Sequence, residues 1–234
     1  MAIKNKENLN TDESGNAFVY ILIAVVLFGS LSFMMSRSNT NTAAKSELDD
    51  AQLAFQVEAI IKYTTEVQSV LARMQASGTH PDDIDFILPG AAAFDTAPNY
   101  DKIYHSAGGG LYQKNLNTAI LGIPVTTPTA GWYLGSFNNV EWTPSTSNDI
   151  VLTAYNISDE LCAALNKKLI GDETVPSITF DPAEVLIDDS FGGASNDNFE
   201  VADCASCEGK PMLCINGTPP GLSVNAFYSI VLAQ

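Results

Sequence analysis

The longest uninterrupted hydrophobic stretch of the chain runs from Ala17 to Met35, nineteen residues without a charge or a proline. A helix of this length extends about 28 Å, close to the hydrocarbon thickness of a bilayer. The run is longer than the core of a secretory signal peptide, and no small-x-small cleavage site follows it. The pattern predicts a retained transmembrane helix over residues 16–36, with a cleaved signal peptide as the alternative.

Beyond a polar break, the apolar positions recur every three or four residues. They are Leu53, Val57, Ile60, Thr64, Val67, Leu71 and Met74. This spacing is typical of a helix that packs along one seam. Ser77-Gly78, with Pro81 beyond it, provides a stop signal. The pattern predicts an amphipathic spacer helix over residues 37–77.

After Gly78, short apolar runs alternate with turn residues. The candidate strands are Ile84–Leu88, Trp132–Phe137, Ile150–Tyr155, Ser177–Phe180, Glu184–Ile187, Leu213–Ile215 and Leu222–Leu232. In the last of them, one face is expected to carry Val224, Ala226, Tyr228, Ile230 and Leu232. Asn216-Gly217 predicts a tight hairpin turn after the sixth strand.

One further helix is expected between these strands. Ser158 provides an N-cap, a leucine stripe follows at Leu161, Leu165 and Leu169, and Gly171 ends the helix. The predicted fold is α+β: a long N-terminal transmembrane and amphipathic helix packed on a C-terminal antiparallel β-sheet domain. The expected divisions are a leader or cytoplasmic segment (1–15), the transmembrane helix (16–36), the spacer (37–77) and an exported globular domain (78–234).

The charge of the chain limits the classes of partner that it is expected to bind. The formal net charge is −16 and the sequence pI is about 4.2, with no dense block of lysine and arginine. Phosphate binding needs basic patches, so nucleic acid is excluded as a partner. An acidic surface instead favours a soluble, exported domain.

Four cysteines all lie in the C-terminal part of the chain: Cys162, Cys204, Cys207 and Cys214. An even number in an exported domain predicts one or two disulfides, with Cys162 bonded to one of the other three. Zinc binding and free or redox-active thiols are the alternatives, but only one close Cys-x-x-Cys pair is present for a zinc site. Basic residues flank the hydrophobic run equally, so their distribution does not predict the orientation of the helix in the membrane. The cysteines do, because disulfides favour a C-terminal domain that lies outside the cytoplasm.

An acidic loop offers weak calcium candidates at Asp188, Asp189, Asp197 and Glu200. Their spacing does not fit an EF-hand, which favours a solvated loop without a cofactor. The only histidines, His80 and His105, have no recognisable nucleophile motif beside them. No enzymatic activity is predicted.

The order of these segments resembles type IV pilins and the pseudopilins of type II secretion. Asp12-Glu13-Ser14-Gly15 before Asn16-Ala17-Phe18 is similar to a prepilin leader and its junction. The resemblance implies that a prepilin peptidase cleaves after Gly15 and that Asn16 is then methylated. The stretch ISDELCAALNKKLIGDETVPSI is similar to a pilin helix whose cysteine pairs with one near the C-terminus. Tyr20 stands where the family usually has a glutamate, which favours a minor subunit.

The expected function is that of a structural, minor or accessory subunit of a type IV pilus or type II secretion pseudopilus. Its N-terminal helix would pack against other pilin or pseudopilin subunits through its small residues, Ala24, Gly29, Ser30 and Ser32. The expected location is the bacterial inner membrane, crossed once, with the C-terminal domain periplasmic or on an extracellular filament. The alternative is a membrane-tethered periplasmic binding or adhesion module that does not polymerise.

Overall fold

The computed structural model describes residues 42–125, 127–187, 197–218 and 222–234, with side chains from Asp50 onward. The chain divides into two compact units, Met1–Ala51 and Gln52–Gln234, of which the second contains nearly all described residues. The expected leader and transmembrane segment lie outside the described residues. Within the described part, none of the helices is both long and apolar enough to cross a membrane.

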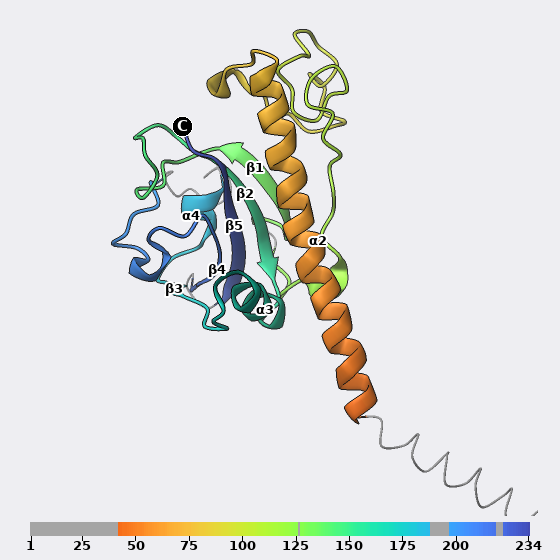
Figure 1. The fold of residues 1–234 in the computed structure, drawn as a ribbon, viewed down its shortest axis with the longest axis vertical. Helices are drawn as coiled ribbons and strands as arrows, with labels where there is room; N and C mark the ends of the chain where they lie inside the picture. Colours follow the sequence, from red (N-terminus) through yellow and green to blue (C-terminus); the bar gives the residue numbers. More distant parts are fainter. Residues whose placement is uncertain (1–41, 126, 188–196, 219–221) are drawn as a thin grey trace, which may run out of the picture. The chain divides into compact units, whose positions relative to one another are not determined.

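A five-stranded sheet forms the centre of the second unit, in the order β1-β2-β5-β4-β3 (Figure 1). The strands are β1 (Gly131–Ser136), β2 (Ile150–Ile157), β3 (Ser177–Ile178), β4 (Met212–Gly217) and β5 (Val224–Leu232). Three of the four pairings are antiparallel, but the short β3 runs parallel to β4. The predicted α+β class is confirmed, while the purely antiparallel sheet is corrected to a mixed one.

The helices are α2 (Thr42–Ala76), α3 (Asp159–Ile170) and the single-turn α4 (Ala183–Leu186), with 3-10 turns η1 (Pro81–Asp83), η2 (Thr118–Ile120) and η4 (Ala205–Cys207). Helix α2 lies along one face of the sheet, and α3 lies beside the same face (Figure 1). The start of the predicted spacer, residues 37–41, lies outside the described residues.

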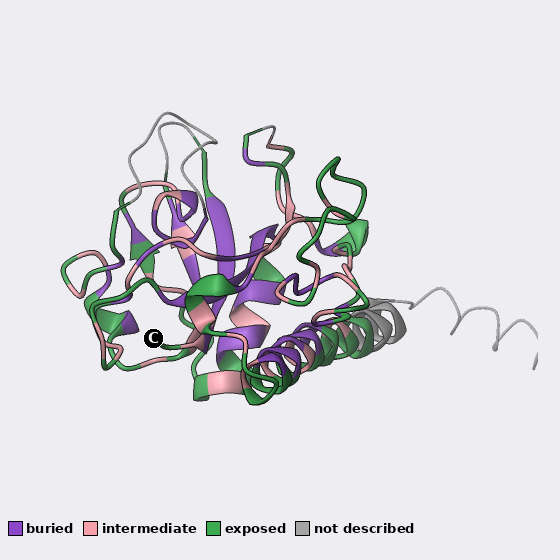
Figure 2. Cartoon of the chain, turned by 90° about the horizontal axis from the view of Figure 1, so that it is seen from above, coloured by how far each residue is buried: buried purple, intermediate pink, exposed green. Residues whose placement is uncertain are grey.

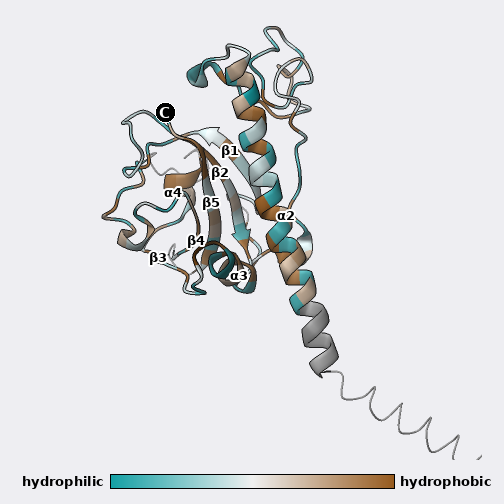
Figure 3. Cartoon of the chain, viewed as in Figure 1, coloured by the Kyte–Doolittle hydropathy of each residue, from teal (hydrophilic) through white to brown (hydrophobic). Residues whose placement is uncertain are grey.

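The predicted seam of α2 is confirmed. Six of its seven positions are buried, from Val57 to Met74, and only Leu53 is partly exposed. Figure 2 shows the buried side of α2 turned toward the sheet, and Figure 3 shows hydrophobic and hydrophilic residues alternating along the helix. Tyr63 meets Trp132 of β1 edge-on, with ring centroids 4.8 Å apart. Burial of this stripe, rather than helix propensity, holds the helix on the domain.

Helix α2 ends where the sequence predicted. Gly78 has a φ of +96°, its N–H donates to Gln75 O, and the Thr79 N–H donates to Met74 O. These two bonds form a Schellman motif, which needs a residue in the left-handed region and therefore favours glycine.

Each face of the sheet has its own core. On the α2 side, Leu152 and Ala154 of β2 and Phe227 and Val231 of β5 are buried with the helices. The opposite core contains Val224, Ala226 and Tyr228, with Ile230 packed against it, as the alternation predicted. Leu232 packs on the α2 side instead, because a register shift between Ile150 and Val151 of β2 reverses the alternation at the end of β5.

Helix α3 confirms the predicted boundaries. The Ser158 Oγ accepts from the Leu161 N–H at 3.3 Å, and Gly171 closes the helix with a φ of +77°. Leu161 and Leu165 are fully buried beside Val57 and Ile60 of α2. The helix thus completes the core on the α2 side of the sheet.

Three local predictions were wrong. Ile84–Leu88 is not a strand and makes only an isolated bridge from Asp85 to Lys102. Glu184–Ile187 contains the helical turn α4, because Asp181 Oδ1 accepts from the Ala183 N–H and fixes a turn in place of extended backbone. Asn216-Gly217 is not a turn, since both residues pair with β5.

Candidate functional site: a groove between α2 and β1

Several site residues expected from the sequence lie outside the described residues. They are Gly15 and Asn16 of the expected processing junction, the small residues Ala24, Gly29, Ser30 and Ser32, and the acidic Asp188 and Asp189. The remaining expected residues, the four cysteines and two acidic side chains, are described.

The four cysteines form two disulfides. Cys162–Cys214 joins α3 to β4, and Cys204–Cys207 closes the turn η4. This confirms the prediction that Cys162 bonds to one of the three later cysteines, and it rules against the zinc alternative. All four residues are at most 4% exposed, so both bridges are structural.

Backbone N–H groups hold the described part of the acidic loop in place. The Asp197 N–H donates to Glu184 O at 3.4 Å, and the Glu200 N–H donates to the Asp203 carboxylate at 2.9 Å. Among the described residues, no three His, Cys, Asp or Glu side chains are placed to hold a metal ion. The structure therefore adds no support for calcium at Asp197 and Glu200.

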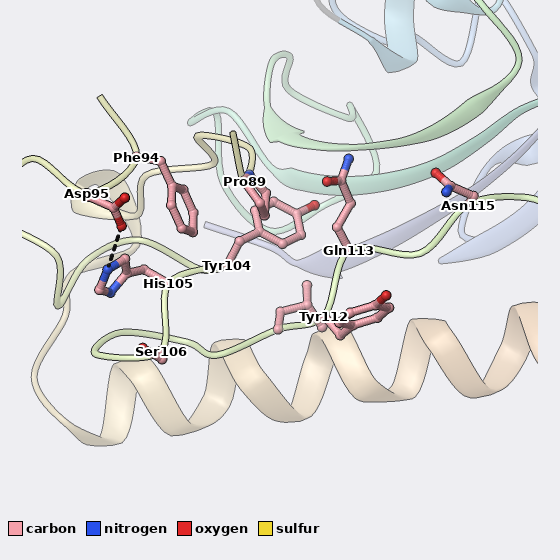
Figure 4. Close-up of a pocket in the computed structure, with 10 residues that line it drawn as sticks. Pro89, Phe94, Asp95, Tyr104, His105, Ser106, Tyr112, Gln113 and Asn115 are labelled. Atoms are coloured by element: carbon pink, nitrogen blue, oxygen red, sulfur yellow. Dashed lines mark ion pairs between the residues drawn. The ribbon is translucent and has the colours of Figure 1, made fainter. Parts of the chain in front are cut away.

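A groove that no sequence pattern predicted lies in the long connection between α2 and β1. It has a volume of about 590 Å³ (Figure 4). Its buried floor consists of Tyr104 and Leu111, and its partly buried walls are Phe94, His105 and Gln113. The exposed rim comprises Pro89, Asp95, Ser106, Tyr112 and Asn115. These residues are spread over 27 positions, and no periodic pattern links them.

Asp95 and His105 face one another at one end of the groove (Figure 4). The His105 Nδ1 accepts from the Ala107 N–H at 3.1 Å, which places the proton of a neutral ring on Nε2. That nitrogen lies 3.5 Å from Asp95 Oδ1. The Phe94 ring lies tilted beside the imidazole, with centroids 5.3 Å apart.

This arrangement does not make His105 a general base for the neighbouring Ser106. A base that activates a hydroxyl needs a ring nitrogen free to accept its proton. Here Nδ1 already accepts from the backbone, and Nε2 carries the proton that faces Asp95. His105 as placed is therefore not oriented to activate Ser106.

Apart from Asp95, the groove is close to neutral. Burial raises the pKa of Tyr104 above its usual range, with the nearby Tyr63 adding to the effect, so the phenol remains protonated. Among the described residues that line the groove, none is lysine or arginine. The nearby Lys102 points its ammonium at other atoms: Ala93 O, Phe94 O, Thr96 O and Asn99 Oδ1.

Lys102 instead holds the loop of residues 93–99 in place. The side chain is 4% exposed, and its Nζ lies 2.9 Å from both Ala93 O and Phe94 O. A buried ammonium needs acceptors in place of water, and the loop carbonyls supply them. The loop is fixed around one cation, which positions Phe94 and Asp95 at the groove.

The comparisons with family models, curated proteins and solved structures produced no match to this chain.

Proposed function

We propose that the chain is a structural, pilin-like subunit, minor or accessory, of a type IV pilus or type II secretion pseudopilus. In this proposal residues 16–36 anchor the subunit in the inner membrane and then pack against other subunits. The folded C-terminal domain lies outside the cytoplasm, in the periplasm or on a filament.

The observation that carries the proposal is the buried seam of α2. The chain is helical from Thr42, seven residues after the end of the hydrophobic run at Met35, and it is packed on the sheet from Val57 to Met74. A subunit that assembles through an N-terminal helix needs the domain fixed firmly to that helix. The seam from Val57 to Met74 fixes the domain to α2, the helix that follows the hydrophobic run in the sequence.

The two disulfides support the location outside the cytoplasm. Structural disulfides persist in oxidising compartments and are rare in the reducing cytosol. Both bridges lie in the domain that follows the hydrophobic run, and neither involves the N-terminal 161 residues. The net charge of −16 suits a domain exposed to water on a membrane or filament surface.

The test is the intact mass of the protein isolated from its native membrane. Processing as a prepilin gives a species that begins at Asn16 with the mass of one added methyl group. A Gly15→Val variant should keep the whole leader, because a bulky residue before the junction blocks cleavage. A wild-type species that begins at Met1 or Ala2 would overturn processing.

A second function is favoured by the groove: a membrane-tethered binding module that does not polymerise. The long connection that builds the groove is held rigidly by Lys102, as expected for a binding loop on a scaffold. Cross-linking in the membrane separates the two functions. A pilin-like subunit cross-links to other pilins through residues 16–36, whereas a tethered module does not.

A further inference from the structure

We propose that the groove binds a neutral carbohydrate, an oligosaccharide of two or three pyranose units. The proposal is independent of whether the chain polymerises, because it concerns only the groove residues of the second unit. It depends on three properties of the groove: its aromatic surfaces, its planar polar groups and its rigidity.

The aromatic surfaces match the apolar faces of a pyranose ring. Tyr104 lies in the floor, Phe94 stands in one wall, and Tyr112 lies on the rim with 77% of its surface exposed (Figure 4). An exposed aromatic ring offers a flat apolar surface on which a ligand can pack. A sugar offers C–H groups that pack on an aromatic face and hydroxyls that remain hydrated around it.

The polar groups of the groove can form hydrogen bonds with hydroxyls on adjacent carbons of a sugar ring. Asp95, Gln113 and Asn115 each present a planar carboxylate or amide, and Ser106 adds a hydroxyl. Carboxylate and amide oxygens accept from sugar hydroxyls, and the amide nitrogens donate to them. His105 Nε2 lies 3.5 Å from Asp95 Oδ1, and the Asp95 side chain is 90% exposed, so its carboxylate oxygens are accessible to a ligand.

The charges argue against other classes of ligand. Phosphates and nucleotides need cationic or backbone donors, and the described lining residues provide no lysine or arginine. A lipid or other apolar ligand needs a mostly apolar pocket, whereas seven of the ten lining residues carry polar side-chain atoms. A neutral, hydroxyl-rich ligand uses both the aromatic surfaces and the planar polar groups of this lining.

Contacts within the domain hold the groove residues in place, which lowers the entropic cost of binding. Lys102 fixes the loop that carries Phe94 and Asp95. Gly109 packs so tightly that an added Cβ would lie 2.3 Å from Ile103 O, and Arg73 of α2 donates to the Gly109 carbonyl. The segment that carries Gly109 is therefore held against α2.

The test is saturation-transfer difference NMR on the full chain in micelles of a phosphocholine detergent, because a detergent with a sugar head group would compete for the groove. The probes are maltotriose, cellotriose and the trimer of N-acetylglucosamine, each at millimolar concentration. We expect saturation transfer to the ring protons of at least one trisaccharide, strongest for the protons on one face of the sugar.

Two variants and a matched control locate the site. Tyr112→Ala should weaken binding about tenfold, the equivalent of one lost aromatic contact. Asp95→Asn keeps the shape and should weaken binding by a similar factor. Tyr100→Ala is the control, since Tyr100 is 67% exposed and lies outside the groove lining, and it should bind as the wild type does.

Two outcomes overturn the proposal. One is the absence of saturation transfer to all three probes with wild-type protein whose circular dichroism matches a folded α+β domain. The other is saturation transfer that is as strong in Tyr112→Ala and Asp95→Asn as in Tyr100→Ala, which would assign the sugar contact to another surface.

Discussion

The side chain of Asn166 pairs with the backbone of Cys214 as a neighbouring strand would. Its Oδ1 accepts from the Cys214 N–H at 2.8 Å, and its Nδ2 donates to the Cys214 carbonyl at 2.9 Å. The second Nδ2 hydrogen is directed to Thr174 O at 3.0 Å. Both residues are fully buried, and β3 pairs with β4 only at residues 216 and 217. The asparagine thus completes the edge of β4 where β3 does not reach.

Replacing Asn166 should be costly for this reason. Asn166→Leu keeps a similar volume but leaves the buried N–H and carbonyl of Cys214 without partners. At about 1–3 kcal/mol per unsatisfied group, the free energy of unfolding should fall by about 3 kcal/mol. Urea denaturation followed by circular dichroism measures it. The exposed Asn115→Leu should change stability by no more than about 0.5 kcal/mol, and equal effects of the two variants would contradict this role of Asn166.

The two disulfides should differ in what their removal costs. Cys162–Cys214 spans 52 residues and Cys204–Cys207 spans 3, so the first restricts the unfolded chain far more. On the chain-entropy model, removing the first costs about 4 kcal/mol and the second about 2 kcal/mol. Paired cysteine-to-alanine variants, compared by urea denaturation, measure the two values. A larger loss for the Cys204/Cys207 pair would show that local packing outweighs loop closure.

Gly109 should not tolerate a side chain. A Cβ there would lie 2.3 Å from Ile103 O and 2.8 Å from Val70 Cγ1 of α2, so the loop would have to move away from the helix. Gly109→Ala should lower the free energy of unfolding by about 1–3 kcal/mol. The matched control is Gly131→Ala in β1, where the nearest atoms lie 4.0 Å from the new Cβ and little change is expected. Similar denaturation midpoints for the two variants would contradict the close packing.

The elements found from the sequence are those whose signals are local and periodic. The seam of α2, the capped helix α3 and the alternation of β5 each follow from side-chain spacing of 3.5, 3.6 or 2 residues. The start of α3 depends on one residue, Ser158, that caps its own helix. Such elements can be predicted because a short stretch of consecutive residues determines them.

The predictions were wrong where a single contact, or a contact between residues far apart in the sequence, determines the local structure. Glu184–Ile187 has the composition of a strand, but the Asp181 carboxylate fixes a helical turn there. Asn216-Gly217 has a hairpin sequence, yet cross-strand pairing with β5 keeps it extended. The groove was not predicted because its lining residues, among them Asp95, His105 and Tyr112, come from an irregular connection without a periodic pattern, in which Lys102 holds the segment of Phe94 and Asp95.

Alkaline pH should destabilise the domain through its buried tyrosines. Burial is the main cause that raises the pKa values of Tyr63, Tyr104, Tyr155 and Tyr228 above the ordinary value of 10.0, and for Tyr155 the neighbouring Asp181 raises it further. The folded protein therefore holds these protons more tightly than the unfolded chain. Their contribution to stability is fully present below about pH 10 and decreases as the pH rises above it.

The expected slope follows from the number of tyrosines that stay neutral only in the folded state. Each lowers the free energy of unfolding by about 1.4 kcal/mol per pH unit above about pH 10.

Tyr228→Phe removes one such group, whose hydroxyl donates to Lys210 O at 3.1 Å. Urea denaturation at several alkaline pH values should show a slope that is shallower by about 1.4 kcal/mol per pH unit in this variant. Lysines also titrate in this range, but they are the same in both proteins, so the difference in slope isolates Tyr228. Identical slopes would mean that Tyr228 ionises as readily in the folded domain as in the unfolded chain, and its burial against the aromatic ring of Phe199 would then not control its titration.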